Sequence, residues 1–441
     1  MKEKLVDILT KTFREWELFS IRKEKRPIQF ASGACTMIKE SVTEGFAIRV
    51  IDKGKIGFFA STSLHNIPEI IEQLKTNLVF GKEGAFEFTD NYTADNRIQT
   101  YDPAIENLSN EKIIFQGQEV VNKIAEYNSD IDINVYLEAE TNDIHLLNSR
   151  GLNLSEKKSL YSCVIEGTLS DQGEIINVYK GGASGAYDLA IMEIAREIIF
   201  VFEYSKKKVR LDRNNTKVPI IFHPDAIDVL FLPIFHAFNG HNMYLGTSPL
   251  LGKEGLQEFS THLTITESPQ THHATFSRNF DDEGIAIREK YLVKNGRINE
   301  FLYDLNTAHN MNTTVTGNGF RSNASSPNMF MEPTINATGL SVKEGTIKND
   351  DIIKNTKRGI IIYSLLGVGQ GNIINGNFSN NIQIGFYIEN GEIVGRVKDI
   401  MIAGNSFECF KNIDCIGNKR FHEKEALSTP YMQFSNINVV C

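Results

Sequence analysis

The chain is poor in several residue types that mark particular classes of protein. Among its 441 residues there are 11 prolines and a single tryptophan. Scarce proline argues against long turn-rich or disordered tracts. A composition of 41% hydrophobic and 23% charged residues is that of an ordinary folded protein. At about 150 residues per domain, the length predicts two or three domains, each able to bury its own core.

Cysteine is also scarce, and its spacing excludes common cysteine-based sites. The five cysteines are Cys35, Cys163, Cys409, Cys415 and Cys441. Their number is odd, and no pair has the C-x-x-C spacing of a zinc knuckle or a redox site. This usage is typical of a reduced protein, so we expect a cytoplasmic one.

The chain has no long hydrophobic run and no excess of positive charge. The longest apolar run, residues 359–369, is about half of what a bilayer span needs. Residues 1–17 alternate charged and apolar residues at helical spacing, unlike the continuous apolar core of a signal peptide. The 46 Lys and Arg against 55 Asp and Glu give a net charge of −9. We therefore expect neither a membrane nor a nucleic acid as partner.

Hydrophobic periodicity predicts an α+β fold in two parts. In the first part, strands with period-two alternation are mixed with helices, of which residues 67–77, 110–127 and 188–204 are the clearest. Asn66 is predicted to cap the first helix, and Asn110 or Ser109 to start the second. A hairpin turn is predicted at residues 52–55, where Gly54 can take a positive φ, and a second turn between strands at residues 148–151. In the second part, short strands are separated by Asn-Gly turns, which favours antiparallel β structure. We place the boundary in the charged segment 206–216. The prediction is an N-terminal α/β domain (1–215) with an antiparallel sheet and helices, and a strand-rich antiparallel β domain (216–441).

His236 and His241 form the most suggestive local cluster, at the end of the apolar stretch 229–235. Two imidazoles can bind zinc if their lone pairs converge. Residues five apart on a helix point about 140° away from each other, so these two converge only if the helix ends before His241. Gly240 permits such an end. No glutamate stands beside His236 to act as a base on a metal-bound water, and the spacing alone favours a structural pair.

Two further clusters are less specific. Asp281, Asp282 and Glu283 could bind a hard cation, but they lack the alternating ligands of an EF-hand loop. We interpret them as a solvated turn that is closed by Gly284 and paired with Arg288. The glycines Gly367, Gly369 and Gly371 follow a β-like run, as in a phosphate-binding loop. The residues after them do not form a helix and contain no Gly-Lys-Ser/Thr, which favours a glycine turn between closely packed backbones.

Taken in order, short motifs along nearly the whole chain resemble the TldD/PmbA family, once labelled modulators of DNA gyrase and classed with metallopeptidases. They are Gly45-Phe-Ala-Ile-Arg-Val50, Gly57-Phe-Phe-Ala-Ser-Thr62, Asn148-Ser-Arg-Gly151, Ala237-Phe-Asn-Gly240, Ser248-Pro-Leu-Leu-Gly252, Asp281-Asp-Glu-Gly284 with Arg288, Gly317-Asn-Gly-Phe-Arg321 with Pro327-Asn328, Gly367-Val-Gly-Gln-Gly371, Gly376-Asn-Phe-Ser379, Glu389-Asn-Gly-Glu392, Ile402-Ala-Gly-Asn405 and Ile416-Gly-Asn418. Each motif is weak alone, and their number and order carry the resemblance.

The resemblance implies where a zinc site would lie. The TldD type carries H-E-x-x-G-H, whose histidines bind zinc together with a cysteine near the C-terminus. His236 and His241 match the two histidines, but Ala237 replaces the glutamate. Near the expected cysteine stands Ser428, a poor zinc ligand, and Cys441 comes only thirteen residues later. We therefore expect no cofactor on this chain alone, with zinc at the two histidines as the alternative.

Losing both the base and the thiolate points to the PmbA (TldE) type, the metal-free member of the family. It resembles a subunit that pairs with a TldD-type zinc peptidase, encloses the substrate cavity and takes part in cleaving peptides or unfolded proteins. The candidate residues for peptide binding or for lining the cavity are Asp281, Asp282, Glu283, Arg288, Arg321, Gly367, Gly369 and Gly371. Glycine-rich strands of this kind can hold an extended peptide by added strand hydrogen bonds.

Two alternatives remain open. The first is a self-sufficient zinc hydrolase that uses His236 and His241, completed by a carboxylate from residues 281–283 or by His272 or His273. The second is a peptide-binding homodimer without any peptidase partner.

Overall fold

The structure is a computed structural model that describes residues 2–90, 92, 98–171, 173–211, 218–268 and 271–440. Of the sequence predictions, Cys441 and residues 212–216 of the boundary segment 206–216 lie outside the described residues.

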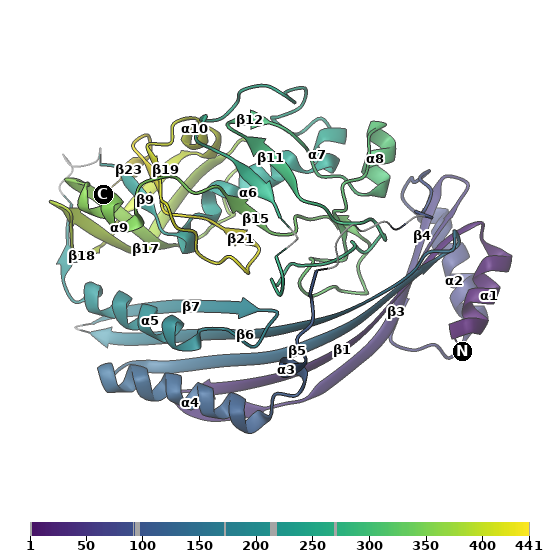
Figure 1. Cartoon of the computed structure of the whole chain (residues 1–441), viewed down its shortest axis with the longest axis horizontal. Coiled ribbons are helices and arrows are strands. Elements are labelled where there is room, and N and C mark those ends of the chain that lie inside the picture. The colour runs from purple at the N-terminus through teal and green to yellow at the C-terminus, as the bar shows by residue number, and fades with distance from the viewer. Residues whose placement is uncertain are drawn as a thin grey trace.

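The N-terminal part is a curved antiparallel sheet of long strands (Figure 1). The strands are β1 (Glu15–Ala31), β2 (Ala34–Ile38), β3 (Ser41–Asp52), β4 (Lys55–Ser61), β5 (Asp132–Asn148), β6 (Asn153–Asp171) and β7 (Glu174–Ser184). Their order is β4-β3-β1-β5-β6-β7, with β2 paired to β1. The turns predicted at residues 52–55 and 148–151 are confirmed, because Asp52 pairs with Lys55 and Leu147 with Asn153.

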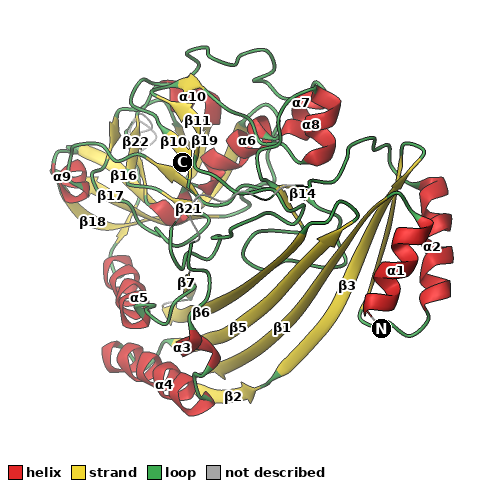
Figure 2. Ribbon diagram, turned by 45° about the vertical axis from the view of Figure 1, so that its right-hand side comes forward, coloured by secondary structure: helices red, strands yellow, loops and turns green. Residues whose placement is uncertain are grey.

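Helices pack at both ends of this sheet (Figure 2). They are α1 (Lys2–Thr12), α2 (Ile67–Phe80), α3 (Pro103–Glu106), α4 (Asn110–Tyr127) and α5 (Ile191–Ser205). The N-caps of α2 and α4 are the predicted Asn66 and Ser109, whose side chains accept backbone N–H groups at the start of each helix. Helices α1 and α2 share a core with β1 and β3, whereas α4 and α5 share one with β5 and β6.

The C-terminal part lies on the concave side of the N-terminal sheet (Figure 1). Its helices are η2 (Pro224–Ala226), α6 (Asp228–Phe238), α7 (Gly240–Tyr244), α8 (Leu305–Met311), α9 (Asn349–Lys354) and α10 (Ser406–Lys411). Its strands are β8 (Lys208–Val209), β9 (Ile220–Phe222), β10 (Ile265–Glu267), β11 (Lys290–Lys294), β12 (Arg297–Ile298), β13 (Gly319–Phe320), β14 (Thr334–Ile335), β15 (Leu340–Val342), β16 (Arg358–Leu365), β17 (Asn377–Glu389), β18 (Glu392–Val397), β19 (Met401–Asn405), β20 (Cys415–Ile416), β21 (Leu427–Ser428), β22 (Met432–Phe434) and β23 (Asn438–Val440).

These strands form mostly antiparallel sheets around the buried helix α6. The larger sheet has the order β20-β22-β9-β16-β17-β18-β8, with β19 bridging β17 and β23. A second sheet has the order β12-β11-β10-β15-β21, and β13 pairs with β14. The pairs β9–β16, β8–β18 and β15–β21 are parallel. The α+β prediction, with a strand-rich second part, is confirmed.

The two parts share hydrophobic core as well as charged contacts. Helix α5 packs against β6 and β7 of the N-terminal sheet and also against β17 and β18. One buried cluster accordingly joins Ile165 and Val201 to Ile361 and Phe386. Within the described ranges, no helix has both the length and the apolar character needed to cross a membrane.

Candidate functional site

The two histidines lie at the junction of α6 and α7. Helix α6 ends at Phe238, and Asn239 is extended with φ −72° and ψ 120°. Gly240 fixes this break: its N–H donates to the Leu302 carbonyl at 2.8 Å, and a Cβ there would lie 2.5 Å from that same oxygen. The helix therefore ends before His241. Without this end, the two imidazole rings would point away from each other.

The surroundings of the pair do not complete a zinc peptidase site. Burial lowers the pKa of His236, and its Nε2 is buried without a hydrogen-bond partner. His241 is exposed. Ala237 is fully buried in the C-terminal core, so the position of the expected base carries a methyl group packed among apolar side chains. In the part of the chain that the structure describes, no three His, Cys, Asp or Glu side chains gather in a way that could hold a metal.

The other candidate ligands are engaged elsewhere. Ser428 Oγ donates to the Phe421 carbonyl at 2.8 Å. His272 Nδ1 accepts the Gln99 backbone N–H, and His273 Nε2 lies 3.1 Å from Gln99 Oε1. With two imidazoles, no adjacent carboxylate and no third donor among the described residues, the side chains do not fit a catalytic zinc.

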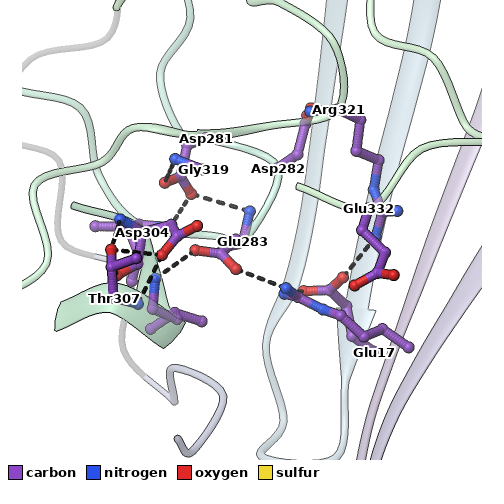
Figure 3. A network of polar contacts seen from close by, with 12 residues as sticks. Glu17, Asp281, Asp282, Glu283, Asp304, Thr307, Gly319, Arg321 and Glu332 are labelled. Atoms are coloured by element: carbon purple, nitrogen blue, oxygen red, sulfur yellow. Dashed lines mark hydrogen bonds and ion pairs between the residues drawn. The ribbon is translucent and has the colours of Figure 1, made fainter. Parts of the chain in front are cut away.

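Asp281, Asp282 and Glu283 are buried, so the interpretation of a solvated turn paired with Arg288 is wrong. Each carboxylate is at most 1% exposed. Arg288 instead pairs with Glu300 on the surface, at 2.6 Å. The acidic turn faces the N-terminal sheet, where Arg49 pairs with Glu283. Figure 3 shows Glu283 near Glu17 of that sheet.

The acidic turn forms a polar clamp between the two parts. Glu283 accepts from Arg49 of β3 at 2.7 Å, and Arg49 also donates to Glu17 of β1 at 2.9 Å. Arg321 donates to the other oxygen of Glu17 at 2.8 Å. Asp282 accepts from Arg278, which also binds Glu156 of β6. Three strands of the N-terminal sheet are thereby tied to segment 278–321.

Asp281 differs from its neighbours because only backbone groups bind its carboxylate. It accepts N–H groups from Glu283 at 3.0 Å, Ile285 at 2.9 Å and Gly319 at 2.9 Å. Burial raises the pKa of Asp281 well above its usual range and that of Glu283 to about 7. Gly319 has to lack a side chain, since a Cβ would lie 2.5 Å from the Glu283 carboxylate. These groups organise the fold; their assignment to peptide binding stays a prediction.

The glycine loop after β16 is a turn, as predicted. Gly367 and Gly369 have φ of 71° and 85°, values that glycine adopts without strain. A Cβ on Gly371 would lie 2.7 Å from the Asn377 carbonyl, so the two backbones pack closely. A Cβ on Gly369 would be 3.7 Å from Leu232 of α6, which places this loop beside that helix.

A second cluster, missed from the sequence, lies between β7 and the C-terminal part. Asp225 contacts Lys180 of β7 and lies 2.7 Å from Nε2 of His422. His422 Nδ1 is 3.3 Å from Glu425. Burial opposes charge on this ring, yet its hydrogen bonds to Asp225 and Glu425 raise the pKa of His422 to about 10. No local motif signals the cluster, since its members come from three distant segments.

Two stretches of the sequence match two models of one protein family. The model described as PmbA/TldA metallopeptidase C-terminal domain matches residues 215–441, and that of PmbA/TldA metallopeptidase domain 1 matches residues 16–78. The chain belongs to the PmbA/TldD family. The resemblance inferred from short motifs is thereby confirmed, and the chain is a metallopeptidase-related protein.

Individual proteins are also similar to this chain in sequence. An uncharacterized protein of Methanocaldococcus jannaschii is 27% identical over 414 residues, 93% of each chain. A metalloprotease PmbA homolog of Buchnera aphidicola is 30% identical over 62% of this chain, a match that spans 57% of the Buchnera protein.

Solved structures of the family share the fold. TldE from Thermococcus kodakarensis superposes with a TM-score of 0.89 at 22% identity, covering 100% of both chains. A putative modulator of DNA gyrase from Thermotoga maritima gives 0.88 at 22% identity, covering 100% of this chain and 99% of the other.

Proposed function

We propose that the chain is a PmbA/TldE-like subunit that pairs with a TldD-type zinc peptidase and takes part in cleaving peptides or unfolded proteins, without a complete zinc site of its own. The observation that carries the proposal is Ala237, fully buried at the position where the base would stand. A zinc peptidase needs a carboxylate beside its metal-bound water, and an alanine facing the core cannot supply one.

The names of similar proteins support a TldD-type subunit as the partner. The solved structure with a TM-score of 0.89 is named TldE, and curated relatives include both PmbA and TldD homologs. The four described cysteines are free, which supports a reducing, cytoplasmic location. Cleavage chemistry then belongs to the TldD-type subunit, while this chain contributes to holding the peptide.

Metal analysis and peptidase assays test this function. Chain purified without chelators should carry well under one zinc per molecule and should not hydrolyse unfolded protein or peptides alone. Adding a TldD-type protein should produce hydrolysis. Zinc-dependent hydrolysis by the lone chain that disappears in His236→Ala would show a self-sufficient peptidase instead. Peptide binding without stimulation of any TldD-type protein would favour the homodimer.

A further inference from the structure

A cavity of about 710 Å³ opens between the edge strand β7 and the C-terminal part. Residues 179–183 of β7 form one wall, and residues 224–228 and 422–427 form the other. The cavity lies at the opposite end of α6 from His236, because Asp228 is the first residue of that helix. It is therefore separate from the histidine pair.

The charges around this cavity do not balance. Its cations are Lys180 and His422, and both already contact Asp225. Three further carboxylates surround them: Glu425, Glu197 and Asp228. Glu425 contacts His422, and Glu197 lies 3.9 Å from Lys180. Asp228 is exposed to the cavity, and no cation of the described residues forms an ion pair with it. Among the residues that line the cavity, the three carboxylates of Asp225, Asp228 and Glu425 thus face two cations, which favours a positively charged occupant.

Burial raises the pKa of both Asp228 and Glu197, in keeping with this shortage of positive charge. Asp225 is the opposite case: burial opposes its charge, but His223, His422 and Lys180 hold its pKa well below the usual range. Asp225 is therefore neutralised within the protein, and Asp228 is the carboxylate left for a ligand.

Strand β7 offers a backbone surface along the same cavity. It is the last strand of its sheet, and in the described chain no backbone hydrogen bond joins residues 175–183 to anything but β6. An edge strand presents alternate N–H and C=O groups to any extended segment that lies beside it. Gly181 and Gly182 bring no side chains to this edge.

Exposed apolar side chains continue this surface along the strand. Ile175 and Tyr179 are 73% and 65% exposed, although edge strands that remain uncovered usually carry charged residues. A peptide paired with β7 would cover both side chains. The free edge and the apolar side chains thus lie on one strand, and the unbalanced carboxylates lie on the other wall of the cavity beside it.

We propose that this cavity binds an extended peptide that adds as a strand to the edge of β7 and places a lysine or arginine side chain against Asp228 and Glu425. The inference rests on the proposed function, since it assigns a sequence preference to the peptides that the subunit handles. Backbone pairing supplies the affinity that does not depend on sequence, and the carboxylates supply the preference for a basic residue. A glutamate at the same peptide position would face the three lining carboxylates and be rejected.

Fluorescence anisotropy with the full chain tests this directly. The probes are labelled, N-acetylated and C-amidated heptapeptides of Thr and Ala with one central lysine, norleucine or glutamate. The lysine peptide should bind about tenfold more tightly than the norleucine peptide, with the glutamate peptide weakest. Asp228→Asn should abolish the lysine advantage, whereas Asp130→Asn, an exposed aspartate outside the cavity, should leave it unchanged. Equal binding of the lysine and norleucine peptides, or no binding at all, would overturn the proposal.

The backbone contribution is tested with the same lysine peptide methylated on alternate backbone nitrogens. Methylation in one register removes the donors that face β7 and should eliminate binding, while methylation in the other register should be tolerated. Equal tolerance of both would exclude strand addition. If the chain stimulates a TldD-type peptidase but shows no lysine preference, this inference fails and the proposed function stands. If the chain binds the lysine peptide selectively but does not stimulate a TldD-type peptidase, the proposed function fails and this inference stands.

Discussion

Glu17 and Arg321 lie 304 residues apart in the sequence and form a buried ion pair at 2.8 Å. The pair joins strand β1 of the N-terminal sheet to the segment after β13 in the C-terminal part. Arg49 binds the second oxygen of Glu17 and also Glu283, so two arginines and two carboxylates form one buried network. The association of the two parts therefore depends on buried charge as well as on shared hydrophobic core.

Removing Glu17 should destabilise the protein strongly. The variant Glu17→Gln leaves Arg49 and Arg321 buried without their shared anion, and breaking such a pair costs about 3–5 kcal/mol. Equilibrium unfolding in urea measures the loss. The matched control is Glu300→Gln, which removes the partner of the exposed Arg288 and should cost no more than about 1 kcal/mol. Similar losses in the two variants would show that the buried network does not hold the parts together.

His422 should make stability depend on pH through its contacts with Asp225 and Glu425. The pKa of the folded-state ring is raised to about 10, above that of an unfolded histidine near 6.5. Its stabilising contribution is therefore complete below pH 6.5 and is lost as pH rises towards 10. The melting temperature of His422→Gln should accordingly lie below that of the wild type at pH 6, and the gap should close by pH 10. Differential scanning fluorimetry across this range measures the gap, and a gap independent of pH would contradict the assignment.

Restoring the family glutamate should not create a peptidase. Ala237→Glu places a carboxylate into the apolar core around α6, which should lower the free energy of unfolding by at least about 3 kcal/mol. Zinc content and hydrolysis by the lone chain should stay at background. Ala125→Glu on the exposed side of α4 is the matched control and should be close to neutral. A stable Ala237→Glu protein that binds one zinc would contradict this prediction, because the glutamate side chain would then reach the histidine pair.

Caps and turns that depend on neighbouring residues were predicted well from the sequence. The caps Asn66 and Ser109 and the turns at 52–55 and 148–151 depend on neighbouring residues, and all four are confirmed. The end of α6 before His241 also followed from a local residue, Gly240.

The environment of the acidic turn could not be predicted in the same way. In the sequence, Asp281 to Glu283 resemble a solvated turn because Arg49, the cation that pairs with Glu283, lies 234 residues away. The same reason hid the cavity beside β7, where Lys180, Asp225 and His422 meet only after folding. Motif order identified the family, but it gave no information on which of its charged residues are buried.

The central claim is that this chain supports a peptidase without contributing metal ligands. The most direct measurement is peptide hydrolysis by a zinc-loaded TldD-type protein mixed with this chain, as the wild type and as the double variant His236→Ala/His241→Ala. The account predicts that both forms of the chain stimulate hydrolysis equally, with zinc only on the TldD-type subunit. Loss of stimulation together with loss of a second zinc in the double variant would contradict it.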